Sequence, residues 1–173
     1  MALTLLLGGA RSGKSTLAVR RARALGGPVV FVATGEALDG EMAERIARHR
    51  AERDAGWSTV EAPVDLAGAL RGLPADACAI VDCLSLWVAN LLQRDLGEAD
   101  VVGLAVETGQ LAAARPAPTI AVSNEVGMGV VPPYELGRRY RDVLGRVNAT
   151  WAELAADAAL VVAGRALALE PTP

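Results

Sequence analysis

The N-terminal residues contain the pattern that most restricts how this chain can fold. An apolar run, Leu3–Leu7, is followed directly by GGARSGKS at 8–15, which matches G-x-x-x-x-G-K-[ST] at every position. Small residues let backbone N–H groups surround a phosphate, and the N-terminus of a following helix favours the same anion. The pattern therefore predicts a buried strand, a phosphate-binding loop over Gly8–Ser15 and a helix over 14–25.

Lys14 within this loop is the single lysine of the chain, since the other 16 of its 17 basic residues are arginine. A compact ammonium suits a phosphate cradle better than a rigid guanidinium fork. We therefore predict that Lys14 contacts the β- and γ-phosphates of a nucleotide and that the Ser15 hydroxyl is a Mg²⁺ ligand. A chance glycine-rich turn is the alternative, and the strand before and helix after the loop argue against it.

Apolar runs of strand length alternate with helical patterns along the whole chain. The runs are near-continuous, as expected for strands covered on both faces. The expected strands are Leu3–Leu7, Val29–Ala33, Ala77–Val81, Thr119–Ser123 and Leu160–Ala163, with a weaker edge strand at Trp57–Glu61. The expected helices are 14–25, 39–54, 65–72, 85–94, 99–114 and 135–157. This order predicts an α/β fold in one domain, 1–173: a three-layer P-loop NTPase (RecA-like) with a mainly parallel central sheet flanked by helices.

Charge and cysteine content restrict the class of partner. The formal net charge of −3 gives no overall attraction to nucleic acid or to an anionic membrane. No run approaches the roughly 20 apolar residues that span a bilayer, and the N-terminal run is interpreted as a buried strand, not a signal peptide. Cys78 and Cys83 are five apart in and after a strand, so their side chains point to opposite faces and no disulfide is expected. A reducing cytoplasm fits this usage.

Asp82 ends the apolar run of CAIVDC at 78–83. In phosphate-loop enzymes an acid at the carboxyl end of a strand holds the Mg²⁺ shell. The alternative is an acid that ends the strand or caps the helix that begins near Ser85. The phosphate loop favours the metal interpretation.

The segment RIARHRAERD at 45–54 holds the only histidine, His49, among four arginines. Arg45, His49 and Arg53 are spaced by four and share one helix face. By pattern alone a solvated helix is favoured, with nearby acids balancing the arginines. Two points favour chemistry: neighbouring cations keep the imidazole neutral, and the arginines could hold a polyphosphate. The spacing leaves both interpretations open.

The segment after the fourth expected strand, VSNEVGMGVVPPYELGRRYRD, starts where loops line the ligand crevice of parallel sheets. Asn124 and Glu125 are candidates to reach a substrate or the water shell of a metal, and Glu125 is a candidate base. A long structural loop with a glycine turn is the alternative. The arginines that follow are either phosphate ligands or part of a solvated or subunit-contact face: Arg138, Arg139 and Arg141.

Taken together, these segments resemble the adenosylcobinamide kinase / adenosylcobinamide-phosphate guanylyltransferase family of cobalamin biosynthesis. Besides GGARSGKS, the resemblance includes E-M-x-x-R-I-x-x-H at 41–49, IVDCLSLWVANLL at 80–92 and N-E-V-G-M-G-[IV]-V-P at 124–132. It covers nearly the whole chain. The tail GRALALE at 164–170 is more apolar than expected, and 95–118 matches no pattern of the family.

The resemblance implies a bifunctional transferase that binds ATP or GTP with Mg²⁺. One activity phosphorylates adenosylcobinamide; the other transfers GMP from GTP onto that phosphate through a covalent guanylyl-histidine, for which the matching residue is His49. It also implies a cytoplasmic homotrimer whose partners are small-molecule substrates, without nucleic acid or a membrane span. The implied catalytic residues are His49 and Lys14, and the implied metal ligands are Ser15 and Asp82. The implied nucleotide contacts are Gly8, Gly9, Ala10, Arg11, Ser12, Gly13, Lys14, Ser15, Ala33, Thr34, Gly35, Arg50, Ala51, Glu52, Arg53, Glu61 and Asp82.

Three other hypotheses are open from the residues alone. A plain small-molecule kinase would use the His49 helix only as a lid or a solvated surface. A RecA-like motor or switch would need nucleic acid, which the net charge disfavours. A nucleotide-sensing module would show no turnover.

Overall fold

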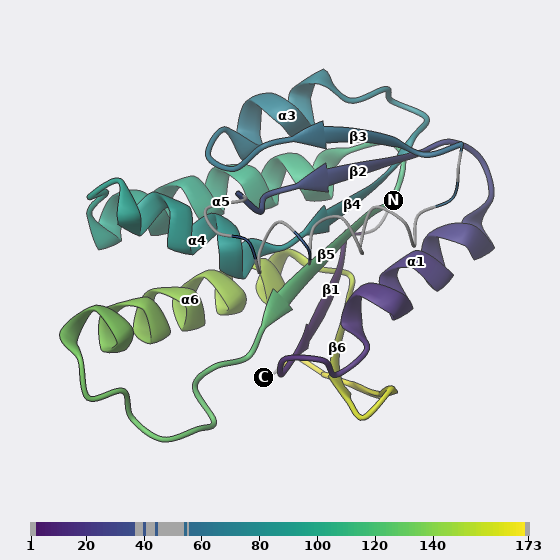
Figure 1. Ribbon diagram of the computed structural model, residues 1–173. Coiled ribbons are helices and arrows are strands. Elements are labelled where there is room, and N and C mark those ends of the chain that lie inside the picture. Colours follow the sequence, from purple (N-terminus) through teal and green to yellow (C-terminus); the bar gives the residue numbers. More distant parts are fainter. Residues whose placement is uncertain (1–2, 37–39, 41–43, 45–53, 55, 172–173) are drawn as a thin grey trace.

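A seven-stranded sheet forms the centre of the protein in the computed structural model, which describes residues 3–36, 40, 44, 54 and 56–171 (Figure 1). The strands lie in the order β3-β2-β4-β5-β1-β6-β7, and all neighbours are parallel except β6 and β7. The strands are β1 Leu3–Gly8, β2 Val29–Ala33, β3 Ser58–Glu61, β4 Cys78–Asp82, β5 Thr119–Asn124, β6 Asp157–Val162 and β7 Arg165–Ala168. The predicted mainly parallel α/β sheet is therefore confirmed.

Helices cover both faces of the sheet, which makes the three layers. The described helices are α1 Lys14–Leu25, α3 Leu66–Gly72, α4 Leu84–Gln93, α5 Glu98–Ala114 and α6 Glu135–Leu154. On one face, Ala18 and Ala22 of α1 pack on Leu6, whereas α3, α4, α5 and α6 pack on the face that carries Leu3 and Leu5 (Figure 1). Both faces of β1 are thus buried, which explains why its sequence is continuously apolar.

The observed elements match the predicted ones closely, except at the C-terminus. The helix predicted over 135–157 ends at Leu154, and the strand predicted at Leu160 begins three residues earlier, at Asp157. The helix stops there because the Ala156 N–H donates to Leu3 O at 2.9 Å and so starts the pairing with β1. Residues Arg165–Ala168 form a further strand that was not predicted, β7, antiparallel to β6. The side chains of β7 are exposed, so this pairing does not bury the apolar residues of GRALALE.

One predicted helix, 39–54, lies almost entirely outside the described residues; within it Gly40 and Glu44 are helical. Both cysteines are free and buried, as the strand geometry predicts. Among the described residues, no helix is both long and apolar enough to cross a bilayer.

Candidate functional site

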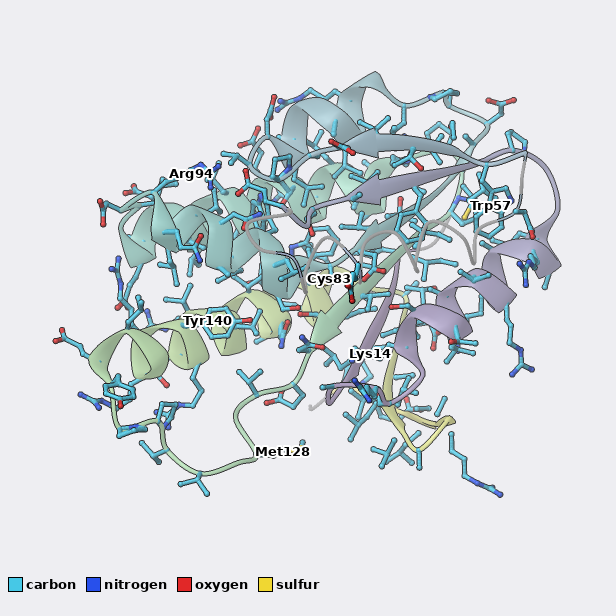
Figure 2. All side chains as sticks on the ribbon, in the orientation of Figure 1. Lys14, Trp57, Cys83, Arg94, Met128 and Tyr140 are labelled. Carbon is cyan, nitrogen blue, oxygen red and sulfur yellow. The ribbon has the colours of Figure 1, made fainter. Side chains whose placement is uncertain are left out.

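The loop Gly8–Ser15 connects β1 to α1 and has the backbone of a phosphate cradle. Gly8 and Gly13 have φ values of 152° and 99°, which side-chain-bearing residues rarely adopt. Lys14, the first residue of α1, is 6% exposed, and its Nζ donates to the Gly9 carbonyl oxygen at 2.6 Å. The ammonium therefore lies across the mouth of the loop, where it can exchange this contact for a phosphate (Figure 2).

The hairpin of β6 and β7 supports the loop from behind. The Gly164 N–H donates to the Ser12 carbonyl oxygen at 2.8 Å. A Cβ added at Gly8 would lie less than 3.0 Å from the carbonyl oxygen of Val161, and one at Gly13 would lie 3.3 Å from Gly164 Cα. The two glycines are thus required by close backbone approach as well as by their φ values. This contact was missed from the sequence, since the hairpin itself was missed.

The carboxyl ends of the parallel strands bring the remaining predicted residues to one edge of the sheet. Ala33 is in register with both Asp82 and Glu61, and Gly8 is in register with Asn124. Strand β5 lies between β1, which carries the loop, and β4, which ends in Asp82. Such an edge, beyond the carboxyl ends of the strands, is where open α/β sheets bind ligands.

Ser15 and Asp82 line one cavity of about 320 Å³ between α1 and the sheet, together with Thr16, Arg20 and Phe31. A serine hydroxyl and a carboxylate on opposite sides of one space are suitable protein ligands for Mg²⁺, which otherwise keeps waters and nucleotide oxygens. The described residues contain no group of three or more His, Cys, Asp or Glu that could hold a metal ion. Ser15 and Asp82 fit a Mg²⁺ ion that arrives with a nucleotide.

Thr34 differs from the other predicted nucleotide contacts, because it is completely buried. Its hydroxyl bonds to the backbone of Cys83, directly after Asp82. Cys83, labelled in Figure 2, follows Asp82 in the chain and is buried; burial, and secondarily the Asp82 charge, raises the pKa of its thiol to about 11. A neutral, buried thiol is a packing group, not a nucleophile.

The segment that follows β5 begins beside the phosphate loop, Gly8–Ser15. The Glu125 N–H donates to Gly8 O at 3.0 Å, and its carboxylate accepts from the Gly127 N–H at 2.6 Å. Beyond it the chain runs out from the sheet edge with large apolar side chains exposed, among them Met128 (Figure 2). Only the first residues of this segment, around Glu125, therefore lie at the site.

The three arginines near the start of α6 make local contacts. Arg138 donates to the carbonyl oxygen of Pro133 at 2.7 Å, and Arg139 donates to that of Leu96 at 2.8 Å. Arg141 bonds to the neighbouring Asp142. Because the three guanidinium groups already bond to protein groups, these bonds favour a role in holding the structure over phosphate binding.

Several predicted residues lie outside the described part of the chain: His49, Arg50, Ala51, Glu52 and Arg53. The other predicted residues are described and lie in the loop or at the ends of β2, β3 and β4. Two buried asparagines were not predicted, Asn90 and Asn148. Asn148 accepts from the Ser123 hydroxyl at 2.6 Å and donates to Asn124 O at 3.0 Å, which fixes the end of β5. An asparagine on an otherwise apolar helix face is the sequence signal that could have identified these two residues.

The sequence profile of the family described as "Cobinamide kinase / cobinamide phosphate guanyltransferase" matches residues 4–169, which include all the elements described above except Leu3, the first residue of β1. The chain belongs to this family. It is 47% identical to the "Bifunctional adenosylcobalamin biosynthesis protein CobP" of Pseudomonas aeruginosa, over 98% of each chain. It is 39% identical to the "Bifunctional adenosylcobalamin biosynthesis protein CobU" of Escherichia coli, over 94% of this chain and 96% of that protein. The resemblance predicted from the motifs is confirmed.

The fold has more distant structural relatives. The RadB recombinase aligns with a TM-score of 0.51 and 14% identity, over 92% of this chain and 73% of that one. At this identity the likeness shows the fold alone, and the fold is the predicted RecA-like P-loop architecture.

Proposed function

We propose that this single domain phosphorylates adenosylcobinamide with ATP or GTP and then transfers GMP from GTP to the product. Family membership over 4–169 supports the pair of reactions. The observation that carries the proposal is the phosphate loop at the same sheet edge as Asp82, with Ser15 and Asp82 lining one cavity. This edge can hold a triphosphate for either reaction.

In the kinase step the loop holds the nucleotide by its phosphates. Backbone N–H groups of Gly8–Ser15 and the Lys14 ammonium neutralise the β- and γ-phosphates. The acceptor hydroxyl attacks the γ-phosphorus in line, the bond from that phosphorus to the β,γ-bridging oxygen breaks, and the nucleoside diphosphate leaves. Catalysis of this kind depends on positioning and charge neutralisation. Mg²⁺, held by Ser15 and Asp82 when bound, supplies further positive charge to the phosphate oxygens. Glu125, whose backbone bonds to Gly8, is the candidate base for the hydroxyl proton.

In the guanylyl step the nucleophile is His49. Its neutral ring nitrogen forms a bond to the α-phosphorus of GTP while the bond from that phosphorus to the bridging oxygen breaks, and pyrophosphate leaves. A phosphate oxygen of adenosylcobinamide phosphate then attacks the same phosphorus, the P–N bond breaks, and adenosylcobinamide-GDP is released. Division of the displacement into two steps is the usual gain of covalent catalysis. Glu61 at the end of β3, Ala33 and Gly35 at the end of β2, and Arg50–Arg53 are proposed to contact this nucleotide.

Covalent labelling tests the guanylyl step. GTP labelled at the α-phosphorus should leave one acid-labile, alkali-stable GMP on the protein, seen as one added GMP by intact-mass analysis. His49→Ala should abolish the label and retain phosphorylation of adenosylcobinamide, because the kinase step does not pass through the imidazole. Equal labelling of this variant would refute His49 as the nucleophile. Wild-type protein that never labels yet acts as a kinase would favour the plain kinase.

The assembly and location are part of the same proposal. We propose a cytoplasmic homotrimer whose partners are the nucleotide and the corrinoid substrates. Two free, buried thiols suit a reducing compartment. Light scattering of the purified protein measures the oligomeric state, and a monomeric mass at micromolar concentration would reject the trimer.

A further inference from the structure

Thr34 follows the last residue of β2, and its polar groups are directed at the chain that leaves Asp82. Its hydroxyl accepts from the Cys83 N–H and donates to the Cys83 carbonyl oxygen, both at 2.7 Å. Its own N–H donates to the Asp82 carbonyl oxygen at 3.2 Å. Three hydrogen bonds from one buried residue therefore hold the backbone directly after the acid.

Asn90 of α4 completes this arrangement from the other side. Its Nδ2 donates to the Thr34 carbonyl oxygen at 2.7 Å and to the Pro63 carbonyl oxygen at 3.0 Å. Asn90 is 4% exposed, so both bonds are made inside the protein. The N–H, the carbonyl and the hydroxyl of Thr34 are thus all engaged by protein groups. The same amide holds the turn that follows β3 and Glu61.

We propose that Thr34 and Asn90 are positioning residues that fix the direction of the Asp82 carboxylate, and that Thr34 is not itself a ligand of the nucleotide. The inference rests on the proposed role of Asp82 toward Mg²⁺ and nucleotide. Asp82 is the last residue of β4, so the ladder bonds that orient the strand end there. Beyond this point Cys83 is held by the bonds from Thr34 and by the first turn of α4, where the Trp87 N–H donates to the Cys83 carbonyl oxygen at 3.2 Å. Mutation of groups that orient metal ligands in this way typically lowers metal affinity or activity by about 10- to 100-fold.

The test replaces the hydroxyl and retains the shape. Thr34→Val removes both bonds to Cys83 and keeps the branched side chain, whereas Thr34→Ser keeps the hydroxyl. Thr108→Val is the matched control, because Thr108 is an equally buried threonine whose hydroxyl bonds only to Leu104 and Ala105 within α5. Thr108→Val also loses a buried hydroxyl, but within α5 and not at the end of a strand. Asn90→Ala is a second variant, independent of the first if Thr34→Val does not fold.

Two measurements apply to each variant: kcat and KM per folded molecule, and nucleotide affinity as a function of Mg²⁺ concentration. In Thr34→Val the Mg²⁺ concentration for half-maximal nucleotide binding should rise about 10- to 100-fold. Nucleotide affinity without Mg²⁺ should be unchanged, because the phosphate loop is intact. At saturating Mg²⁺ the kcat should fall while the KM for the nucleotide changes little, since the loop still binds the phosphates. Asn90→Ala should shift in the same direction, Thr34→Ser should restore wild-type behaviour, and Thr108→Val should change thermal stability only.

The result that would overturn the proposal is a Thr34→Val protein with a lower melting temperature but wild-type Mg²⁺ dependence and kcat per folded molecule. Loss of Mg²⁺-free nucleotide affinity would also overturn it, since Thr34 would then be a nucleotide ligand. The binding measurement needs no corrinoid. A wild-type protein that fails to phosphorylate adenosylcobinamide therefore rejects the proposed function, while the Mg²⁺ shift still decides the role of Thr34.

Discussion

Gly8→Ala tests whether the close contact between the phosphate loop and the terminal hairpin is required for the fold. A methyl group at this position would lie less than 3.0 Å from the Val161 carbonyl oxygen and 2.9 Å from Ser12 Oγ. The backbone oxygen belongs to β6, which pairs with β1 and β7, so it cannot retreat cheaply. Overpacking of this kind costs about 1–3 kcal/mol. The φ of 152° adds strain of about 1–3 kcal/mol for a residue with a Cβ.

The expected loss is therefore about 2–6 kcal/mol, a large part of the roughly 5–15 kcal/mol that stabilises a typical domain. Urea unfolding followed by circular dichroism, at one fixed protein concentration, measures the loss as a lower midpoint with an unchanged slope. The matched control is Gly9→Ala, because Gly9 has open space around its Cβ position. Its effect on stability without ligand should be within about 0.5 kcal/mol.

Nucleotide binding gives a second readout of the same contact. Saturating nucleotide at about 100 times its Kd should stabilise the wild type by about 2.7 kcal/mol, and Gly8→Ala should lose most of this gain because its loop is displaced. Wild-type stability of Gly8→Ala would refute the reasoning, since the hairpin would then yield to the loop without cost. Equal loss in both variants would show that glycine is needed in the loop for another reason.

Two other predictions concern the cation and the thiols. Lys14→Ala should impair both the kinase and the guanylyl reaction, measured by product formation with each substrate, because one loop holds the triphosphate in both; full kinase activity would place that reaction elsewhere. Cys78 and Cys83 should resist iodoacetamide in the native protein at pH 8 and react in urea, since burial raises the pKa of each thiol from 9.0 to about 11. The fold holds both thiols neutral, so the free energy of unfolding should fall as pH rises from about 9 to 11. Rapid native alkylation, with mass spectrometry as readout, would contradict the burial.

The inner strands of the sheet were predictable because β1, β2, β4 and β5 are buried and are therefore largely apolar. The weaker apolar pattern that includes Ser58–Glu61 indicated an edge strand, and the alternation of strands with helices indicated a parallel sheet. The antiparallel strand β7 was not predictable, because its exposed residues need no apolar pattern and its pairing with β6 depends on a turn at Ala163 and Gly164. Both of these residues have positive φ, and alanine gives no sign of it in the sequence.

Part of the candidate site could also be predicted from the sequence, and part could not. The loop and Asp82 were predictable, because their residue types and their place after a strand follow from phosphate and metal chemistry. The direction of the Thr34 hydroxyl was not, because it depends on Cys83, which is 49 residues away in sequence. Asn90 and Asn148 act across similar distances, 56 residues to Thr34 and 25 to Ser123. Buried polar groups of this kind become visible only when the partner elements are in place.

The strand order explains how one edge can serve two different displacements. In the proposed function the loop after β1 holds the phosphates, and β5 lies between β1 and β4, which ends in Asp82. The segment that follows β5 therefore leaves the sheet between the loop and Asp82. A triphosphate held there by Lys14 presents its γ-phosphorus and its α-phosphorus at opposite ends of the chain of phosphates. The two reactions then need no second triphosphate site, only different attacking groups. It follows that variants of the loop should impair both activities together, whereas variants of an attacking group should separate them.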